Sequence, residues 1–207
     1  ESFLRGMSQA DLVTVTTEKL ATYARNYNPN VAVLPNCLNF KKWWQLNLKP
    51  NPQLRVGWTG GVSHYEDWHS IKEPLNRLMR EYQFKLIMSG ADFSGVIDDD
   101  NKHLVELHDW VGFQGFSYHV MALALDIAII PLANLPFNHY KSSVKWYEMS
   151  AVGVPSVVSN ILPYSEDVIH DKTGLLYKNG KEFYESVRQM IARPTIRHKI
   201  GQEAKKW

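Results

Sequence analysis

Short apolar runs alternate with amphipathic stretches along most of the chain, a pattern typical of strand–helix–strand units and a parallel sheet. From Leu54 onward the pattern is regular, and it predicts about six short strands, at residues 54–58, 84–89, 104–107, 125–131, 154–159 and 174–177. Helices are predicted between and after them, at residues 67–82, 117–125, 142–152, 163–170, 181–192 and 194–205. The run at 125–131 is apolar throughout, as in a strand buried on both faces. We therefore expect a Rossmann-like, doubly wound and mostly parallel α/β sheet.

A shorter strand–helix–strand pattern precedes this series, at residues 11–16, 17–26 and 31–34. Residues 37–53 lack clear periodicity and end in Pro50-Asn51-Pro52, which is typical of a linker. We expect residues 1–36 to be the remnant of an N-terminal domain, residues 37–53 to be an interdomain linker, and residues 54–207 to be the main, C-terminal domain. Because the first nine residues have the pattern of a helix interior, we expect the chain to be part of a longer protein.

Composition narrows the classes of partner. The 207 residues carry a formal net charge of +2, which is too balanced for a nucleic-acid-binding surface. The longest apolar run, residues 120–132, contains Asp126 and falls short of the roughly 18 residues that span a bilayer. Cys37 is the single cysteine, so an intramolecular disulfide is excluded and a reducing compartment fits. We expect a cytoplasmic protein, with peripheral attachment to a membrane left open.

The loop after the first strand of the main series is a candidate ligand site, because ligands of doubly wound sheets bind beyond the carboxyl ends of the strands. Gly60 and Gly61 in this loop allow close approach of the backbone to a ligand. Free N–H groups there, together with Ser63 and His64, can bind a phosphate. The loop matches neither the Walker sequence nor G-x-G-x-x-G. The alternative is an ordinary tight turn between a strand and a helix.

A second loop follows the buried strand and leads into a helix, and its candidate binding residues are Lys141, Ser142, Ser143, Lys145 and Glu148. The helix is expected to begin at one of the two serines. A helix N-terminus is an anion site because its first N–H groups lack partners, and the two lysines add charge there. Glu148 shares a helical face with Lys145 and can accept hydrogen bonds from sugar hydroxyls. We predict a site for a diphosphate and a ribose; the alternative is a solvated helix face with a routine Lys–Glu pair.

Three aromatic residues in the predicted loop over 108–116, namely Trp110, Phe113 and Phe116, stand apart from the expected core. Trp110 and Phe113 are candidates for the wall of a base or sugar pocket, and plain packing is the alternative.

Two groups of residues have the composition of a metal site. Asp98-Asp99-Asp100 matches Asp-x-Asp, but short acidic runs are more typical of solvated turns. The second group has a spacing that fits no standard site and consists of His64, Glu66, Asp67 and His69. We therefore expect no bound metal and no cofactor.

Three segments resemble the C-terminal half of GT-B fold glycosyltransferases, near the large retaining family 4, also called glycosyl transferases group 1. They are residues 11–43 (DLVTVTTEKL to VAVLPNCLNFKKW), 56–67 (VGWTGGVSHYED) and 126–164 (DIAIIPLANLPFNHYKSSVKWYEMSAVGVPSVVSNILPY). The resemblance extends over roughly residues 10–205, and the third segment is the most specific.

The resemblance assigns roles to single residues. In the family, a helix opened by a Glu-x7-Glu motif binds the donor, and the second Glu matches Glu148, which the resemblance makes the ribose ligand. The first Glu falls at Tyr140, where this sequence departs from the pattern. The family's Arg and Lys phosphate pair follows the first strand, but here the stretch after the strand at residues 54–58 has no lysine until Lys72. The resemblance therefore implies that Lys141 and Lys145 neutralise the phosphates.

The function implied by the resemblance is transfer of a sugar, with retention, from a nucleotide-diphosphate donor to a sugar or lipid-linked acceptor in polysaccharide or glycoconjugate synthesis. An N-terminal domain of the same chain would supply the acceptor site and much of the catalytic apparatus, so that these residues alone would be inactive. Two alternatives stay open. One is a nucleotide-sugar epimerase of the same fold, and the other is a non-catalytic nucleotide-sugar-binding or scaffolding domain, which the departure at Tyr140 favours.

Overall fold

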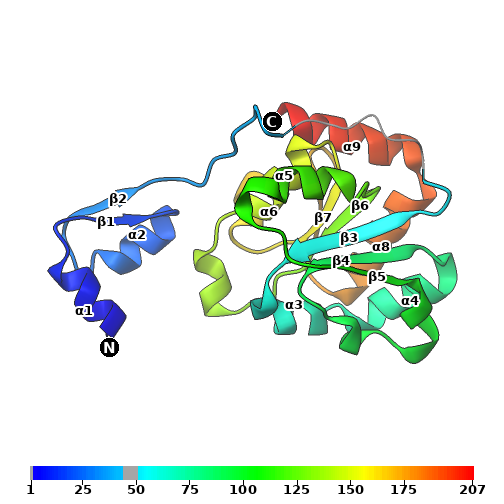
Figure 1. The fold of residues 1–207 in the computed structure, drawn as a ribbon, viewed down its shortest axis with the longest axis horizontal. Helices are drawn as coiled ribbons and strands as arrows, with labels where there is room; N and C mark the ends of the chain where they lie inside the picture. The colour runs from blue at the N-terminus through cyan, green and yellow to red at the C-terminus, as the bar shows by residue number, and fades with distance from the viewer. Residues whose placement is uncertain (1, 44–50) are drawn as a thin grey trace.

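The computed structural model describes residues 2–43 and 51–207 of the chain. In this part, parallel strands form a six-stranded sheet in the order β5-β4-β3-β6-β7-β8 (Figure 1). The strands are β3 (Arg55–Gly60), β4 (Lys85–Gly90), β5 (Val105–His108), β6 (Ile127–Ile130), β7 (Ser156–Ser159) and β8 (Leu175–Tyr177). The order of the strands reverses between β3 and β6, as in a doubly wound sheet. The predicted fold class is confirmed, and each predicted strand is found close to its expected position.

Helices cover both faces of the sheet (Figure 1). One face is covered by α5 (Phe113–Ala122), α6 (Val144–Ala151) and α9 (Pro194–Lys206). The opposite face is covered by α3 (Tyr65–His69), α4 (Lys72–Tyr82) and α8 (Gly180–Ala192). A single turn, α7 (Tyr164–Asp167), follows β7, and the loops contain the 3-10 turns η1 (Val62–His64), η2 (Ser94–Val96), η3 (Asp99–Leu104) and η4 (Pro136–Tyr140). None of the described helices is long and apolar enough to cross a membrane.

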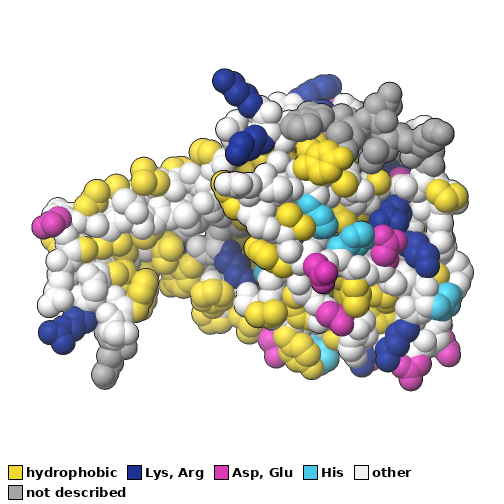
Figure 2. Space-filling view, in the orientation of Figure 1, with side chains coloured by type: hydrophobic (Ala, Val, Ile, Leu, Met, Phe, Trp, Pro, Cys, Tyr) yellow, Lys and Arg dark blue, Asp and Glu magenta, His cyan; other side chains and the backbone are white. Residues whose placement is uncertain are grey.

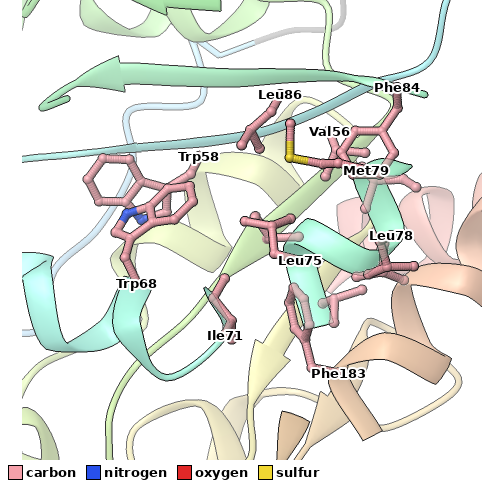
Figure 3. Close-up of a cluster of buried hydrophobic side chains, with 14 of the residues drawn as sticks. Val56, Trp58, Trp68, Ile71, Leu75, Leu78, Met79, Phe84, Leu86 and Phe183 are labelled. Carbon is pink, nitrogen blue, oxygen red and sulfur yellow. The ribbon is translucent and has the colours of Figure 1, made fainter. Parts of the chain in front are cut away.

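The two faces of the sheet bury separate apolar clusters. Alternate residues of β3, Val56 and Trp58, face α3, α4 and α8, and pack there with Leu75 and Phe183 (Figure 3). The opposite cluster is built on β6 and β7 side chains such as Ile130, which pack against α5 and α6. Full burial of a large apolar side chain contributes about 1.5–3 kcal/mol, so these clusters fix the position of the strand ends that carry the site.

The helix predicted at residues 67–82 is interrupted, and this part of the prediction is wrong. Two helices, α3 and α4, meet at Ser70 and Ile71. Pro74 has no N–H to donate to the carbonyl of Ser70, and its ring would collide with that carbonyl in a continuous helix. The Ser70 hydroxyl instead donates to the Asp67 carbonyl oxygen at 2.6 Å. The resulting break leaves α3 as a short helix next to the loop after β3.

The helix predicted at residues 117–125 also has different bounds. It begins at Phe113, directly after the extended residue Gly112, and ends at Ala122. Ala124 then adopts a left-handed backbone conformation with φ of 50°, which terminates a helix. The first turn of α5 therefore carries Phe113, which the sequence placed in a loop.

A small N-terminal unit precedes the sheet and consists of α1 (Ser2–Gln9), β1 (Val13–Val15), α2 (Glu18–Ala24) and β2 (Val31–Val33). Its two strands pair in parallel around a small core of Val15, Ala21 and Ala24. Figure 2 shows hydrophobic side chains over much of this unit. An isolated two-stranded sheet is marginally stable in water. The assignment of residues 1–36 to another domain stays a prediction, and part of the predicted linker, residues 44–50, lies outside the described residues.

The N-terminal unit forms hydrogen bonds to the main domain at the segment Tyr140–Ser142. The Thr17 hydroxyl donates to the carbonyl oxygen of Tyr140 at 3.2 Å, and the Asn36 side-chain amide donates to the Ser142 hydroxyl at 2.6 Å. The Tyr23 and Tyr140 rings meet edge to face with their centroids 5.8 Å apart. This segment lies between η4 and α6, so the unit touches the chain at a predicted ligand-binding loop.

Candidate functional site

The candidate site lies where the strand order reverses, at the carboxyl ends of β3 and β6. Gly60 ends β3 and pairs with Gly90, which ends β4. A Cβ atom on Gly60 would overlap the Trp58 indole and the Lys145 ammonium, and one on Gly90 would overlap the Gly60 carbonyl oxygen. Gly90 has a φ of 100°, which side-chain-bearing residues rarely adopt. The ends of two neighbouring strands therefore present bare backbone.

Lys145 extends from the first turn of α6 toward β3. Its Nζ donates to the Thr59 carbonyl oxygen at 2.6 Å and lies 4.8 Å from the centroid of the Trp58 ring. Burial lowers the pKa of Lys145 to about 8, although nearby Glu148 acts in the opposite direction. A buried ammonium group that contacts only a carbonyl and an aromatic face would be stabilised by an anion.

Lys141 and Ser143 lie at the start of α6. The Lys141 Nζ and the Ser143 hydroxyl are both buried and have no hydrogen-bond partner among the described residues. Burial lowers the pKa of Lys141, and Asp67 opposes this effect. Ser143 occupies the N-cap position, but its side chain makes no capping hydrogen bond. Because buried polar groups without partners are rare in native proteins, these two point to a ligand at the helix start.

Glu148 lies one turn further along α6, on the face that carries Lys145. Burial raises the pKa of Glu148 to about 7, and the positive charge of Lys145 opposes this shift. Both side chains are partly buried, unlike those of the solvated pair that was the alternative for this helix. A partly buried carboxylate with a raised pKa is a good acceptor for the hydroxyl groups of a bound sugar.

His64 ends η1 and is tied to the beginning of the next helix. Its Nδ1 lies 2.5 Å from Asp67 Oδ2. The other carboxylate oxygen of Asp67 accepts hydrogen bonds from the Ala133 backbone N–H at 2.7 Å and from the Asn138 side-chain amide at 3.0 Å. A single buried carboxylate thus joins the loop after β3 to the loop after β6. Together these loops and the start of α6 bring cations, free donors and bare backbone to one edge of the sheet.

A comparison with family models gives one match that covers most of the chain. The family described as glycosyl transferases group 1 matches residues 47–207. The chain belongs to this family. A sequence comparison with curated proteins found no match.

Solved structures of glycosyltransferases with the GT-B fold share the fold of this group 1 family member. Sucrose-phosphate synthase from Thermosynechococcus elongatus superposes with a TM-score of 0.68 at 16% identity, over 98% of this chain and 54% of that one. HepE from Anabaena, in complex with UDP-glucose, gives 0.68 at 13% identity, over 95% and 58%. The C-terminal domain of the group 1 protein LpcC from Francisella tularensis gives 0.63 at 13% identity, over 82% and 95%. The chain therefore spans about half the length of sucrose-phosphate synthase and HepE.

Trp110 approaches the same edge of the sheet in this group 1 family member, but Phe113 does not join the residues above. Trp110 is 64% exposed, and its Cε3 lies 3.0 Å from the position that a Cβ of Gly90 would occupy. It stacks on Phe116 with ring centroids 6.3 Å apart. Phe113 is 91% exposed on the first turn of α5. Trp110 thus offers a flat, accessible surface beside the glycines.

The acidic groups considered as metal sites have other contacts. Asp98 pairs with Arg80 at 2.8 Å and Asp99 pairs with Lys102 at 2.6 Å, both at the surface. His69 contacts Tyr65, with the ring centroids 4.5 Å apart and the ring planes tilted by 48°. Within residues 2–43 and 51–207, no group of three His, Cys, Asp or Glu side chains is arranged to hold a metal ion.

Sequence reasoning missed two partners of Lys145 and the role of Asp67. The Thr59 carbonyl and the Trp58 ring contact Lys145, and neither carries a signal in the sequence. The His64-x-x-Asp67 spacing was visible, because residues three apart meet on one helical turn. The composition of this stretch resembles a metal site, whereas the structure makes His64 and Asp67 a hydrogen-bonded pair.

Proposed function

We propose that the chain is the donor-binding half of a glycosyltransferase, with a nucleotide-diphosphate sugar bound at the carboxyl edge of the sheet between β3 and β6. The observation that carries the proposal is the pair of buried ammonium groups, Lys141 and Lys145, at the start of α6. The Lys141 ammonium has no hydrogen-bond partner among the described residues, and that of Lys145 donates to a neutral carbonyl.

The diphosphate is assigned to the two lysines, the first N–H groups of α6 and the backbone at Gly60 and Gly61. Ser63, Ser142 and Ser143 add hydroxyl donors at the edge of this site. Sugar transfer leaves negative charge on the departing diphosphate, and preorganised cations and N–H groups stabilise such charge as it develops. The same groups therefore serve both binding and catalysis, and we expect transfer to need no metal ion.

The nucleoside is assigned to Glu148 and Trp110. Glu148 lies beyond Lys145 on α6 and accepts hydrogen bonds from the ribose hydroxyls. Trp110 stacks on the base beside Gly60 and Gly90. Structures of HepE from Anabaena contain UDP-glucose or UDP, which supports a nucleotide sugar as the donor here.

The remaining parts of the reaction are assigned outside the main domain. A facing N-terminal domain of the same chain would hold a sugar or lipid-linked acceptor, and residues 1–36 would belong to it. We propose a cytoplasmic enzyme of polysaccharide or glycoconjugate synthesis that transfers its sugar with retention. Release of a nucleoside diphosphate from a donor by the full-length protein distinguishes a transferase from an epimerase or a non-catalytic binding domain.

The test is a thermal-shift and calorimetry panel with UDP, GDP and TDP, and with the corresponding monophosphates. We expect one diphosphate to stabilise the chain more than its monophosphate does, because the second phosphate meets the lysines. K141M should weaken this binding, whereas K181M, an exposed lysine on α8, should not. If no diphosphate binds the wild-type chain, or if K141M binds as tightly as wild type, the assignment is wrong.

A further inference from the structure

Asp67 is a buried carboxylate that links two loops of the candidate site and contacts a histidine there. It is 2% exposed, and its carboxylate contacts three groups on two loops: the His64 ring, the Ala133 N–H and the Asn138 amide. A buried carboxylate costs several kcal/mol unless it is fully hydrogen-bonded, as it is here. The side chain therefore has a defined orientation, and so has the histidine that it contacts.

The contact with Asp67 determines which nitrogen of His64 is available. A carboxylate only accepts hydrogen bonds, so the Nδ1 nitrogen carries a hydrogen and donates it. Nε2 is left as the nitrogen with no protein partner among the described residues. The ring is buried and packs edge-on against Trp58, with centroids 5.4 Å apart, and the face of Trp58 also carries the Lys145 ammonium.

Four charged groups affect the pKa of the His64 imidazole or of its neighbour Lys145. Burial lowers the pKa of His64, Lys145 and Lys141 lower it further, and Asp67 opposes them. Glu148 in turn raises the pKa of Lys145. In the free chain His64 is therefore neutral near pH 7.5, with a lone pair on Nε2. A bound diphosphate would offset the charge of the lysines and place negative charge near the ring, which favours the imidazolium form.

We propose that His64 is a proton-coupled contact to the donor diphosphate and that Asp67 is its positioning residue. Nε2 takes up one proton from solvent as the diphosphate binds and donates it in a hydrogen bond to a phosphate oxygen. The proton returns to solvent when the nucleotide leaves, so no other bond is made or broken. This inference rests on the proposed function, because it assigns proton linkage to the same site.

The experiment is isothermal titration calorimetry of the chain with UDP, GDP and TDP in buffers of different ionisation enthalpy at pH 7.5. The dependence of the heat on the buffer gives the number of protons taken up per nucleotide. Protons bound by the nucleotide, Lys145 or Glu148 contribute equally to wild type and to a histidine variant. The wild type should therefore take up about one proton more than H64Q.

Two further variants separate positioning from a merely structural role. D67N keeps the size of the side chain but removes the charge that favours the imidazolium, so it should bind nucleotide with less proton uptake than wild type. H198Q removes an exposed histidine of α9 and should take up as many protons as wild type. Equal uptake by H64Q and wild type would overturn the inference and leave the proposed function intact. Failure of the wild type to bind any of the three diphosphates would overturn both.

A measurement on the wild type covers the case in which the His64 variants do not fold. The chain has 8 histidines, whose Cε1–H signals report protonation by NMR. At pH 7.5 the bound diphosphate should move one of these signals to the imidazolium position. If none moves while nucleotide binds, proton coupling at His64 is refuted.

Discussion

Replacing Lys145 with methionine should stabilise the free chain, or leave its stability unchanged, while weakening nucleotide binding. Burial lowers the pKa of Lys145 from 10.5 to about 8. Since each pKa unit corresponds to about 1.4 kcal/mol, holding this charge costs the folded state about 3 kcal/mol at pH 7. The variant removes that cost, but the Thr59 carbonyl loses its donor, which costs about 1–3 kcal/mol. The net change in the free energy of unfolding should lie between zero and a gain of about 2 kcal/mol.

The same variant has a defined pH signature. Because the folded pKa lies below that of an unfolded lysine, the unfolded state holds more protons between pH 8 and 10.5. Wild-type stability should therefore receive a rising contribution from Lys145 across this window. K145M should lack the rise. Urea unfolding at pH 7 and at several values up to 10.5 measures both effects, and K181M serves as the exposed control.

Nucleotide binding should be weaker in K145M than in the wild type. Loss of a charge-assisted hydrogen bond to phosphate should cost about 1.5–3 kcal/mol, or an affinity reduced about 10- to 150-fold. Calorimetry with the diphosphate that binds best measures this. A K145M chain that is clearly less stable than wild type at pH 7, yet binds nucleotide equally well, would mean that Lys145 is a structural residue and would refute the reasoning.

Three further predictions follow from the same geometry. E148Q should fold but bind the nucleoside diphosphate about tenfold more weakly, because it loses a charge-assisted acceptor. Since burial raises the pKa of Glu148 to about 7, wild-type stability should fall as the pH rises from 4.5 to 7, whereas the stability of E148Q should not show this fall. EDTA should leave nucleotide affinity unchanged, and if it abolishes binding and manganese restores it, Asp98–Asp100 is the relevant motif. G90A should lower the free energy of unfolding by roughly 1–3 kcal/mol in denaturant titrations, because its φ of 100° and the Gly60 carbonyl leave no room for a Cβ.

The sequence was sufficient for those features that depend on local periodicity. Alternation of apolar strands and amphipathic helices predicted the sheet, and the three-residue spacing of Lys145 and Glu148 predicted their common helical face. The break between α3 and α4 was also accessible, because Pro74 lies four residues after Ser70 and excludes a continuous helix there.

Features that depend on contacts between distant segments could not be predicted in the same way. Asp67 reaches Ala133 and Asn138 across more than sixty residues of chain, and no local pattern encodes that approach. The partner of Lys145 is a backbone carbonyl, which every residue has, so residue types give no sign of it. Trp110 likewise lies beside Gly90, twenty residues earlier in the chain, and no local pattern indicates this contact.

The contact of the N-terminal unit with Tyr140–Ser142 has a consequence for recombining domains. Thr17 and Asn36 hydrogen-bond to a segment that belongs, by sequence position, to the other half of the molecule. A chimera cut within residues 37–53 would join foreign N-terminal residues to this segment and lose both hydrogen bonds. Grafting Thr17, Asn36 and residues 140–142 as one inherited block would preserve them, so the useful crossover boundary is set by contacts in space and differs from the boundary along the chain.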